Sequence, residues 1–315
     1  MTKHILVTGG AGFIGSHMAD AFLARGWRVS AIDNLVTGDR RNVDPRVEFH
    51  EADLRDPAAM RLLDELKPDV VAHEAAQIDV RISVKDPAMD AETNVVASLR
   101  LLQKCADIGV KRFLFASTGG AIYGEPVFAP QDESHPTNPL SPYGCAKLAV
   151  EHYMHYFREV HGLATTALRY ANVYGPRQSP HGEAGVVAIF AARMLRGEEV
   201  TINGTGEQTR DFVYVGDVVA ANVAVAERDD LRGPFNVGTG VETSVVELHQ
   251  AMAKVLGDTH PANHAPAKAG EQLRSVLDGA ALRSAAGLRE PVGLADGLAR
   301  TLEWFRSAAA QPPLS

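Results

Sequence analysis

The feature that most constrains this chain is a glycine-rich turn close to its N-terminus. Residues 8–15 read Thr-Gly-Gly-Ala-Gly-Phe-Ile-Gly, directly after a short apolar run at residues 5–7 and before a stretch with helical spacing. A loop that passes closely beneath a pyrophosphate has no room for Cβ atoms, and the helix beyond it offers free N–H groups. The pattern predicts a dinucleotide-binding βαβ unit. The residues expected to contact the phosphates are Gly9, Gly12, Phe13, Ile14 and Gly15.

Further apolar runs follow along the first half of the chain, separated by helix-length segments. They are residues 29–32, 47–50, 70–73, 113–116 and 165–168. Compact apolar runs are typical of strands buried on both faces, and repeated βαβ units imply a parallel sheet with helices on both sides. The sequence therefore predicts an α/β fold: a doubly wound parallel sheet of the Rossmann type with a smaller C-terminal substrate-binding domain.

The character of the sequence changes near residue 170, where loops rich in glycine and proline begin. We expect residues 1–169, with a returning segment at about 210–237, to form the nucleotide-binding domain, and residues 170–315 to form a discontinuous substrate domain. The later elements expected are helices at 186–195 and 217–228 and strands at 199–202, 211–215 and 235–237.

Residues that favour helix ends mark several boundaries. Ser141 precedes Pro142 and should start a helix, and Thr243 should start another, with Glu247 in its first turn. Gly26 stands where the first helix is expected to stop.

Charge and cysteine content exclude several classes of partner. The net charge is 31 − 39 = −8, without a block of Lys or Arg, which argues against nucleic acid and membrane surfaces as partners. Two cysteines cannot form a disulfide scaffold or a zinc site by themselves, and no apolar stretch of about 18 residues occurs. His152, His155 and His161 have helical spacing but no supporting carboxylate or cysteine, so we expect no metal. The sequence predicts a soluble, cytoplasmic protein.

Two aspartates bear on the identity of the dinucleotide. Asp33 ends the second strand, where a carboxylate accepts hydrogen bonds from the adenosine ribose and repels a 2′-phosphate. This favours NAD, although Arg40 and Arg41 nearby are compatible with NADP. Asp53 lies where it could bind the amino group of adenine, and capping a helix is a nearly equal alternative.

Tyr143 and Lys147 are the strongest candidates for catalysis. They are four residues apart in the helix that starts after Ser141, so they share a face. An ammonium near a phenol favours the phenolate, and lowering a tyrosine pKa from about 10 to near 7 takes roughly 4 kcal/mol. Such a tyrosine can act as a general base on a sugar hydroxyl. Ser117 and Thr118 place two hydroxyl groups at the end of the fifth strand.

The combined motifs resemble the NAD-dependent epimerase/dehydratase family of extended short-chain dehydrogenase/reductases, most closely its bacterial UDP-glucose 4-epimerase branch. The resemblance runs from about Lys3 to Phe305. The motifs that carry it are the glycine turn, Ser117-Thr118, Tyr143-x-x-x-Lys147, Asn172 before Tyr174-Gly175-Pro176-Arg177, and Arg210-Asp211-Phe212-x-Tyr214-Val215.

The resemblance implies reversible 4-epimerisation of a UDP-hexose, UDP-glucose or UDP-galactose, through a transient 4-keto sugar with tightly bound NAD. It implies that Tyr143 is the base and that Lys147 holds the nicotinamide ribose. Thr118 would bind the reacting oxygen, with Ser117 as the alternative because the Gly119-Gly120 segment is one residue longer than in some relatives. The other implied cofactor contacts are Asp33, Asn34, Thr37, Gly38, Asp53, Leu54, Ala75, Ala76, Gln77, Asn94 and Tyr170.

The same resemblance assigns the substrate side. Arg210 and Asn172 match residues that hold the pyrophosphate, and Lys268 matches a second basic residue. Ser275 stands at a position that gates the sugar 2-substituent, and a small residue there leaves room for UDP-GlcNAc and UDP-GalNAc. Gly119 and Gly120 replace the acidic residues of dehydrating and decarboxylating relatives, which disfavours both reactions.

Two other functions and one assembly remain as hypotheses. The chain could be a 4-epimerase or 4-keto reductase of another nucleotide sugar, such as a UDP-uronic acid or a dTDP-sugar. More remotely, it could be a non-catalytic NAD-binding protein. The helix after Ser141 has an apolar band wider than one contact face needs, and family dimers pair through this helix and one near residues 90–106, so we expect a homodimer.

Overall fold

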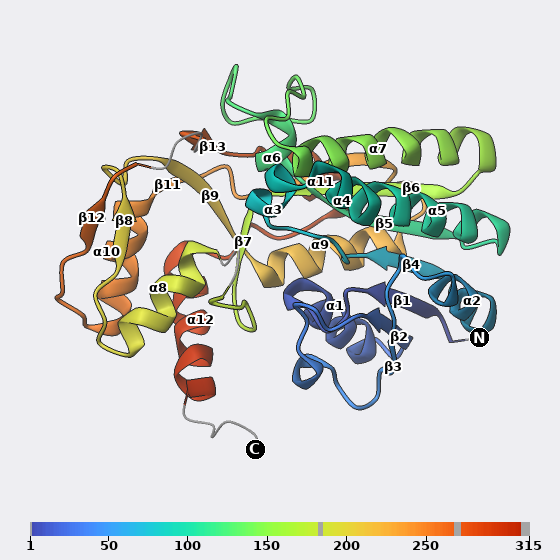
Figure 1. Cartoon of the computed structure of the whole chain (residues 1–315), viewed down its shortest axis with the longest axis horizontal. Coiled ribbons are helices and arrows are strands. Elements are labelled where there is room, and N and C mark those ends of the chain that lie inside the picture. The colour runs from blue at the N-terminus through green and yellow to red at the C-terminus, as the bar shows by residue number, and fades with distance from the viewer. Residues whose placement is uncertain (1, 182–184, 268–271, 310–315) are drawn as a thin grey trace.

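The structure, a computed structural model, describes residues 2–181, 185–267 and 272–309. Within these residues the centre is a seven-stranded sheet in the order β10-β6-β5-β4-β1-β2-β3, in which every neighbouring pair is parallel (Figure 1). Its strands are β1 His4–Thr8, β2 Arg28–Asp33, β3 Glu48–Glu51, β4 Val70–His73, β5 Arg112–Thr118, β6 Ala164–Tyr170 and β10 Gly233–Val237.

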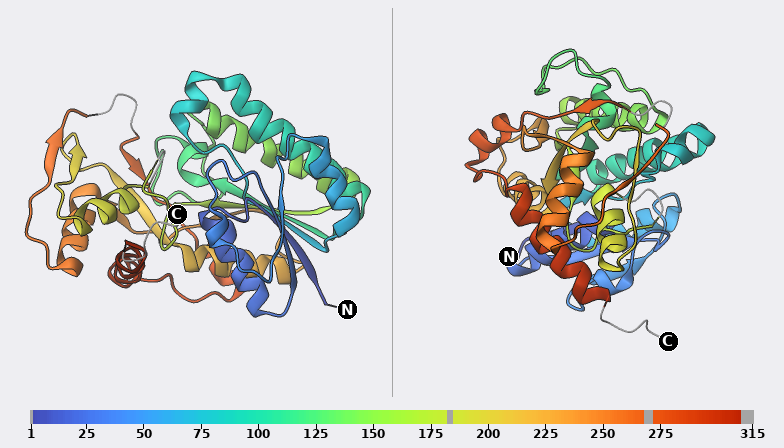
Figure 2. Two further views of the ribbon diagram at one scale, coloured as in Figure 1. Left: turned by 60° about the horizontal axis from the view of Figure 1, so that its bottom comes forward. Right: turned by 90° about the vertical axis from the view of Figure 1, so that its left-hand side faces the viewer.

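Helices cover both faces of this sheet, because its central strands are apolar on both sides. In β1, Ile5 and Val7 belong to one apolar cluster and Leu6 to the other, as a two-residue repeat requires. One face carries α1 Phe13–Ala24, α9 Val215–Glu227 and α11 Ala280–Ala286; the other carries α2 Pro57–Leu66, α5 Ala97–Asp107 and α7 Pro142–His161 (Figure 2). The predicted doubly wound α/β fold is confirmed.

Most of the predicted helix ends are confirmed. The Ser141 hydroxyl accepts from the Gly144 N–H at the start of α7, and Gly26, with φ +74°, follows the end of α1. The start predicted at Thr243 is wrong, because Ser244 caps α10 Val245–Leu256 and forms a capping box with Glu247.

A second part of the molecule packs around its own apolar cluster, at the left of Figure 1. Within the described residues its sheet contains β11 Glu242–Ser244, β9 Thr209–Tyr214, β13 Arg274–Ser275 and β7 Asn172–Tyr174, and a separate pair joins β8 Thr201–Asn203 to β12 Asn263–Ala265. Its helices are α8 Val186–Leu195, α10 and α12 Leu294–Ala309. The remaining short elements are η1 Arg40–Asn42, α3 Val80–Lys85, α4 Pro87–Ala91, η2 Glu92–Val96 and α6 Gly119–Tyr123.

Four predicted boundaries in this later half need correction, and the first is the strand expected at 235–237, which already begins at Gly233. The strand expected at 199–202 begins at Thr201, the strand expected at 211–215 spans Thr209–Tyr214, and α9 already begins at Val215. Moreover, β9 pairs with β7, β11 and β13, whereas β10 joins the central sheet beside β6. The division into two domains therefore stays a prediction.

None of the helices in the described part of the chain combines the length and apolar character that a membrane span needs.

Candidate active site

The predicted catalytic residues meet at the carboxyl edge of the central sheet. Thr118 ends β5, Tyr170 ends β6, and α7 brings Tyr143 and Lys147 to the same edge. The neighbours of β1 are β2 on one side and β4 on the other, so the chain reverses its winding direction there. Ligands of doubly wound sheets bind in the crevice at such a switch point.

The glycine turn fits a pyrophosphate. Gly9 has φ +69°, and a Cβ on it would lie 2.8 Å from the Ala75 nitrogen, while a Cβ on Gly15 would lie 2.2 Å from the Gly9 oxygen. Helix α1 begins after Gly12 with no side-chain cap and no acidic residue in its first turn. The first N–H groups of this helix, from Phe13 onward, are thus open to an anionic group.

Asp33 is fixed beside this turn. Its carboxylate accepts hydrogen bonds from the Ala11 N–H (3.0 Å) and the Leu35 N–H (2.8 Å). The backbone of Gly38 lies so close to this carboxylate that a Cβ on residue 38 would be 2.7 Å from Asp33 Oδ1. The two arginines that could hold a 2′-phosphate are engaged elsewhere. Arg41 pairs with Asp39, and the Arg40 guanidinium lies over the Phe49 ring at 4.5 Å. This arrangement favours NAD over NADP.

Asp53 lies next to the loop that follows β2. It accepts from the Asn34 amide (2.9 Å) and pairs with Arg55 (2.7 Å), and hydrogen bonds from Arg55 hold the pKa of Asp53 well below its usual range. The alternative role of helix cap is wrong, because Asp56 caps α2. Leu54 packs against the apolar cluster beneath, whereas Thr37 is exposed.

The loop after β4 borders the same crevice. The Ala75 N–H donates to the Thr8 hydroxyl (3.3 Å), and Ala76 is partly exposed. Asn94 accepts from the Gln77 N–H (2.9 Å) and donates to the Gln77 carbonyl (2.8 Å). In this structure Asn94 therefore shapes the loop, and its contact with a cofactor stays a prediction.

Lys147 is buried beside Tyr143. Its ammonium donates to the Ala116 carbonyl (2.8 Å) and lies 5.8 Å from the centre of the Tyr143 ring. Burial lowers the pKa of Lys147 to about 8, although the nearby carboxylates of Glu74 and Asp90 act in the opposite direction. Burial first, and then the same two carboxylates, raise the pKa of Tyr143. The expected fall in the pKa of Tyr143 is therefore wrong: the burial and the charges of the chain itself raise this pKa.

Ser117 and Thr118 face different surroundings. Ser117 is buried, and its hydroxyl donates to Glu151 at 2.5 Å. Thr118 is partly exposed at the end of β5, and its hydroxyl accepts from the Ala121 N–H at 3.3 Å. The geometry favours Thr118 as the hydroxyl that reaches a substrate.

The sheet of the second part brings three predicted substrate residues together. Ser275 is the register partner of Arg210, and Asn172 pairs with Phe212, two residues further along β9. Lys268 lies outside the described residues.

The segment around Ser275 also closes the space beside the two glycines that follow Thr118. A Cβ on Gly119 would lie 2.4 Å from the Leu277 side chain, and a Cβ on Gly120 would lie 3.5 Å from the Ser275 hydroxyl. A larger acidic side chain at residue 119 would therefore displace Leu277.

Comparison with known proteins assigns the family. The model of the NAD dependent epimerase/dehydratase family matches residues 5–238. The chain belongs to this family. A UDP-glucose 4-epimerase of Mycolicibacterium smegmatis is 44% identical over 96% of this chain and 98% of its own length.

Two solved structures of UDP-glucose 4-epimerases are similar to this chain in both sequence and fold. The UDP-glucose 4-epimerase of Thermotoga maritima, solved with UDP-glucose, has a TM-score of 0.94 and 47% identity, covering 97% of this chain and 99% of its own. The UDP-glucose 4-epimerase of Thermus thermophilus, solved in complex with NAD, has a TM-score of 0.91 and 46% identity over the same shares. NAD is the cofactor of this epimerase/dehydratase.

Several residues around this epimerase/dehydratase site escaped the sequence analysis. Glu151 follows Lys147 by one helical turn, and this spacing could have marked it. Asp211 is fully buried and accepts from the Thr239 and Leu277 N–H groups, which fixes the strand that carries Arg210. Nothing in the sequence marks Glu74, because its neighbours at the sheet edge come from distant segments.

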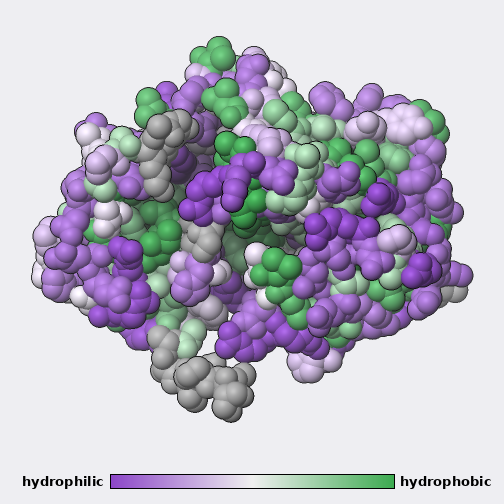
Figure 3. Space-filling view, viewed as in Figure 1, coloured by the Kyte–Doolittle hydropathy of each residue, from purple (hydrophilic) through white to green (hydrophobic). Residues whose placement is uncertain are grey.

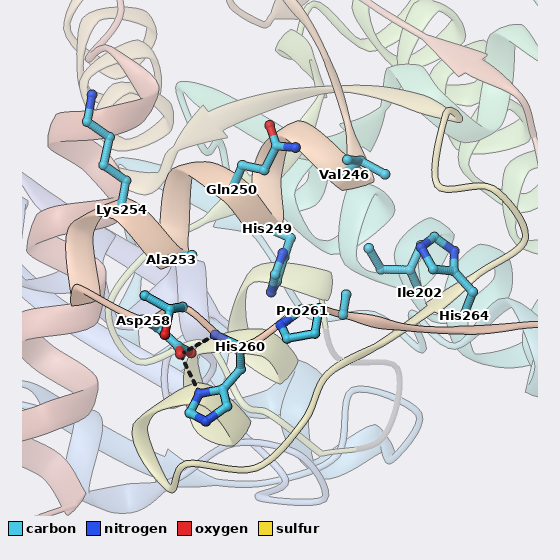
Figure 4. A pocket seen from close by; sticks show the side chains of 12 residues that line it. Ile202, Val246, His249, Gln250, Ala253, Lys254, Asp258, His260, Pro261 and His264 are labelled. Carbon is cyan, nitrogen blue, oxygen red and sulfur yellow. Dashed lines mark hydrogen bonds and ion pairs between the residues drawn. The ribbon is translucent and has the colours of Figure 1, made fainter.

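Figure 3 shows a hollow in the middle of the same face as Figure 1, with hydrophobic residues inside hydrophilic rims. A separate cavity of about 500 Å³ lies between β8, α10 and residues 258–264, and contains none of the predicted site residues. His249 points into it, and His260 is held by Asp258 at 2.6 Å (Figure 4). Among the described residues of this epimerase/dehydratase, no group of three or more His, Cys, Asp or Glu side chains could hold a metal ion.

Proposed function

We propose that this chain is an NAD-dependent 4-epimerase of UDP-hexoses that interconverts UDP-glucose and UDP-galactose. The observation that carries the proposal is the meeting of Tyr143, Lys147 and Thr118 at the carboxyl edge of the sheet, where Gly120 lies beside Ser275, the register partner of Arg210. The similar enzymes of Mycolicibacterium, Thermotoga and Thermus are UDP-glucose 4-epimerases, which supports the same substrate class.

Each of the site residues has its own role in the proposed reaction. Bound NAD would accept the C4 hydride of the sugar and return it to the opposite face. The charges of the chain alone raise the pKa of Tyr143, and the positive charge of bound NAD would favour its phenolate. Tyr143 takes the proton from the sugar O4 and later returns it, while the Thr118 hydroxyl binds that oxygen. Lys147, anchored on the Ala116 carbonyl, binds the nicotinamide ribose. Arg210 holds the pyrophosphate of the substrate, so that only the sugar needs to turn.

The glycines after Thr118 support epimerisation over the related eliminations. Dehydration needs an acid and a base beside C5 and C6, and neither Gly119 nor Gly120 supplies one. Gly120 instead faces Ser275. We propose that the small side chain of Ser275 leaves space for an N-acetyl group, so that UDP-GlcNAc and UDP-GalNAc are also substrates.

One experiment separates the candidate functions. The purified protein, without added cofactor, is incubated with UDP-glucose, UDP-galactose, UDP-N-acetyl sugars, UDP-glucuronic acid and dTDP-glucose, and the anomeric protons are followed by NMR. We expect interconversion of UDP-glucose and UDP-galactose, and NAD in the denatured supernatant. A reductase would instead consume added NADH or NADPH stoichiometrically, and a binding protein would yield no product; either result would overturn the proposal.

We propose that the enzyme is a homodimer that pairs through α7. This helix buries Val150 and Met154 against the sheet, while Tyr153, Tyr156 and Val160 are 45%, 46% and 64% exposed. An exposed aromatic pair on one helix face is unusual for a monomer's surface. Light scattering after size exclusion should give twice the chain mass, and Tyr156→Glu should shift it to the monomer. A wild-type monomer would refute this assembly. The cytoplasmic location stays a prediction.

A further inference from the structure

Glu74 lies next to Ala116, the residue whose carbonyl accepts a hydrogen bond from the Lys147 ammonium. It directly follows β4, in which His73 pairs with Phe115 of β5, so the next residues in register are Glu74 and Ala116. The Ala116 carbonyl accepts the Lys147 ammonium at 2.8 Å. Adjacent strands lie about 4.8 Å apart. The register thus places a carboxylate-bearing residue beside the carbonyl that holds the ammonium.

A chain of hydrogen bonds fixes the Glu74 carboxylate. The Tyr170 hydroxyl donates to Glu74 Oε1 at 3.2 Å, and it accepts from the Asn222 amide at 2.8 Å. Asn222 is itself held on α9, where its amide also donates to the Val218 carbonyl at 2.9 Å. Because the Asn222 amide donates to the Tyr170 oxygen, the tyrosine proton is directed toward Glu74.

We propose that Glu74 is a positioning residue of this site, whose carboxylate is the counter-charge that keeps the buried Lys147 ammonium protonated. Lys147 can hold ribose hydroxyls as an ammonium but loses donors as a neutral amine. The effect of Glu74 on catalysis rests on the proposed function, whereas its effect on the ionisation of Lys147 does not.

The charges around Glu74 determine when this effect operates. The charges of Glu74 and Lys147 act on each other's pKa, and the Glu74 carboxylate also raises the pKa values of Tyr143 and Tyr170. Two further carboxylates, Asp90 on α4 and Glu151 on α7, act on the same Lys147. Burial raises the pKa of Glu74 to about 7, and the nearby Lys147 opposes this rise. Below that pH the carboxyl is neutral and cannot hold the proton on Lys147. Above it, the carboxylate raises the pKa of the lysine. Removing Glu74 should therefore change the enzyme above neutral pH and not below.

Glu74→Gln tests the proposal in the holoenzyme as purified. The side chains of all eight lysines are labelled with nitrogen-15, Lys147→Arg identifies the Lys147 signal, and the signal is followed by NMR as the pH rises. We expect the pKa of Lys147 to fall by about one unit in the Gln variant, because an opposite charge nearby has been removed. The alkaline limb of kcat/KM for UDP-galactose should move to lower pH by the same amount, while the two enzymes converge at lower pH.

Three further variants make the result decisive. Glu65→Gln removes an exposed carboxylate from α2 and should leave both curves unchanged. Glu74→Asp keeps the charge and should move the Lys147 titration back toward that of the wild type. If Glu74→Gln does not fold, Glu74→Leu removes the same charge and should give the same shift. An unchanged titration of Lys147 in a folded neutral variant would overturn the proposal, even if the chain proved not to be an epimerase.

Discussion

The ion pair of Glu151 with Arg169 gives the sharpest test of how this site is held together. The Arg169 guanidinium donates to Glu151 at 2.6 Å, and the two side chains are only 6% and 8% exposed. The same carboxylate accepts the Ser117 hydroxyl at 2.5 Å. Glu151 therefore ties α7, which carries the proposed catalytic pair, to the ends of β5 and β6.

Glu151→Gln leaves the Arg169 guanidinium buried without a counter-charge, a change that costs about 3–5 kcal/mol of the free energy of unfolding in comparable sites. Arg169 also donates to the Tyr123 hydroxyl at 2.8 Å, and its guanidinium lies 5.1 Å from the Tyr123 ring. These contacts compensate part of the loss, so we expect a value near 3 kcal/mol, at the lower end of that range.

The matched control is Glu48→Gln. Glu48 pairs with Arg28 at 2.7 Å, nearly the same distance, but the side chains of Arg28 and Glu48 are 52% and 42% exposed. Exposed pairs of this kind contribute about 0–1 kcal/mol. The two variants thus remove the same charge at nearly the same separation and differ in burial.

Urea unfolding at one fixed excess of NAD measures both variants, because a ligand that binds the folded state shifts the apparent stability. We also expect a fall in kcat for Glu151→Gln, since α7 carries Tyr143 and Lys147. Glu151→Met combined with Arg169→Met should be more stable than Glu151→Gln alone, because no buried charge is left unpaired. If Glu151→Gln cost no more than Glu48→Gln, the reasoning from burial would be refuted.

Four further outcomes are expected. Tyr143→Phe should lower kcat by about 10²–10⁴-fold with an unchanged NAD content, and an undiminished kcat would exclude it as the base. Ser275→Tyr should abolish turnover of UDP-GalNAc and keep that of UDP-galactose; a wild type inactive on UDP-GalNAc would contradict this role. His73 is buried with its pKa lowered to about 3, so it stays neutral while the unfolded chain takes up a proton near 6.5. Stability should therefore fall as pH drops through this interval, by up to about 1.4 kcal/mol per pH unit, and less steeply in His73→Gln; equal slopes in urea unfolding would contradict it. Gly119→Ala should cost about 1–3 kcal/mol in the same assay through its clash with Leu277, and a neutral effect would show that the leucine yields.

The central sheet could be predicted because its signals are local. Most of its strands are apolar runs, β3 at the sheet edge being the exception, and the glycine turn and the Ser141 cap mark the starts of the helices beside it. The second sheet lacks such signals, because β9 is paired with segments at residues 172–174, 242–244 and 274–275. Short strands with distant partners have no repeating pattern that a reading along the sequence could detect.

The pKa of Tyr143 shows that the electrostatics of a site, like the second sheet, cannot be predicted from local sequence signals alone. The sequence reveals the ammonium of Lys147, because both residues lie on one helix face. It does not reveal the carboxylates of Glu74, at the end of β4, and of Asp90, on α4, whose charges raise the pKa of Tyr143. Spacing within one helix predicts which groups meet, but the sign of a pKa shift depends on all groups that face the site.

The segment from Thr209 to Glu227 connects the two sides of the site through adjacent elements. Strand β9 carries Arg210, and α9 follows it without a loop and packs on α1, the helix of the glycine turn. From α9, Asn222 reaches the Tyr170 hydroxyl that holds Glu74. A buried Asp211 fixes the strand at its start. Because a strand and a packed helix in direct succession move little relative to each other, the residue proposed for the pyrophosphate and the hydrogen bonds that orient Glu74 share one rigid support.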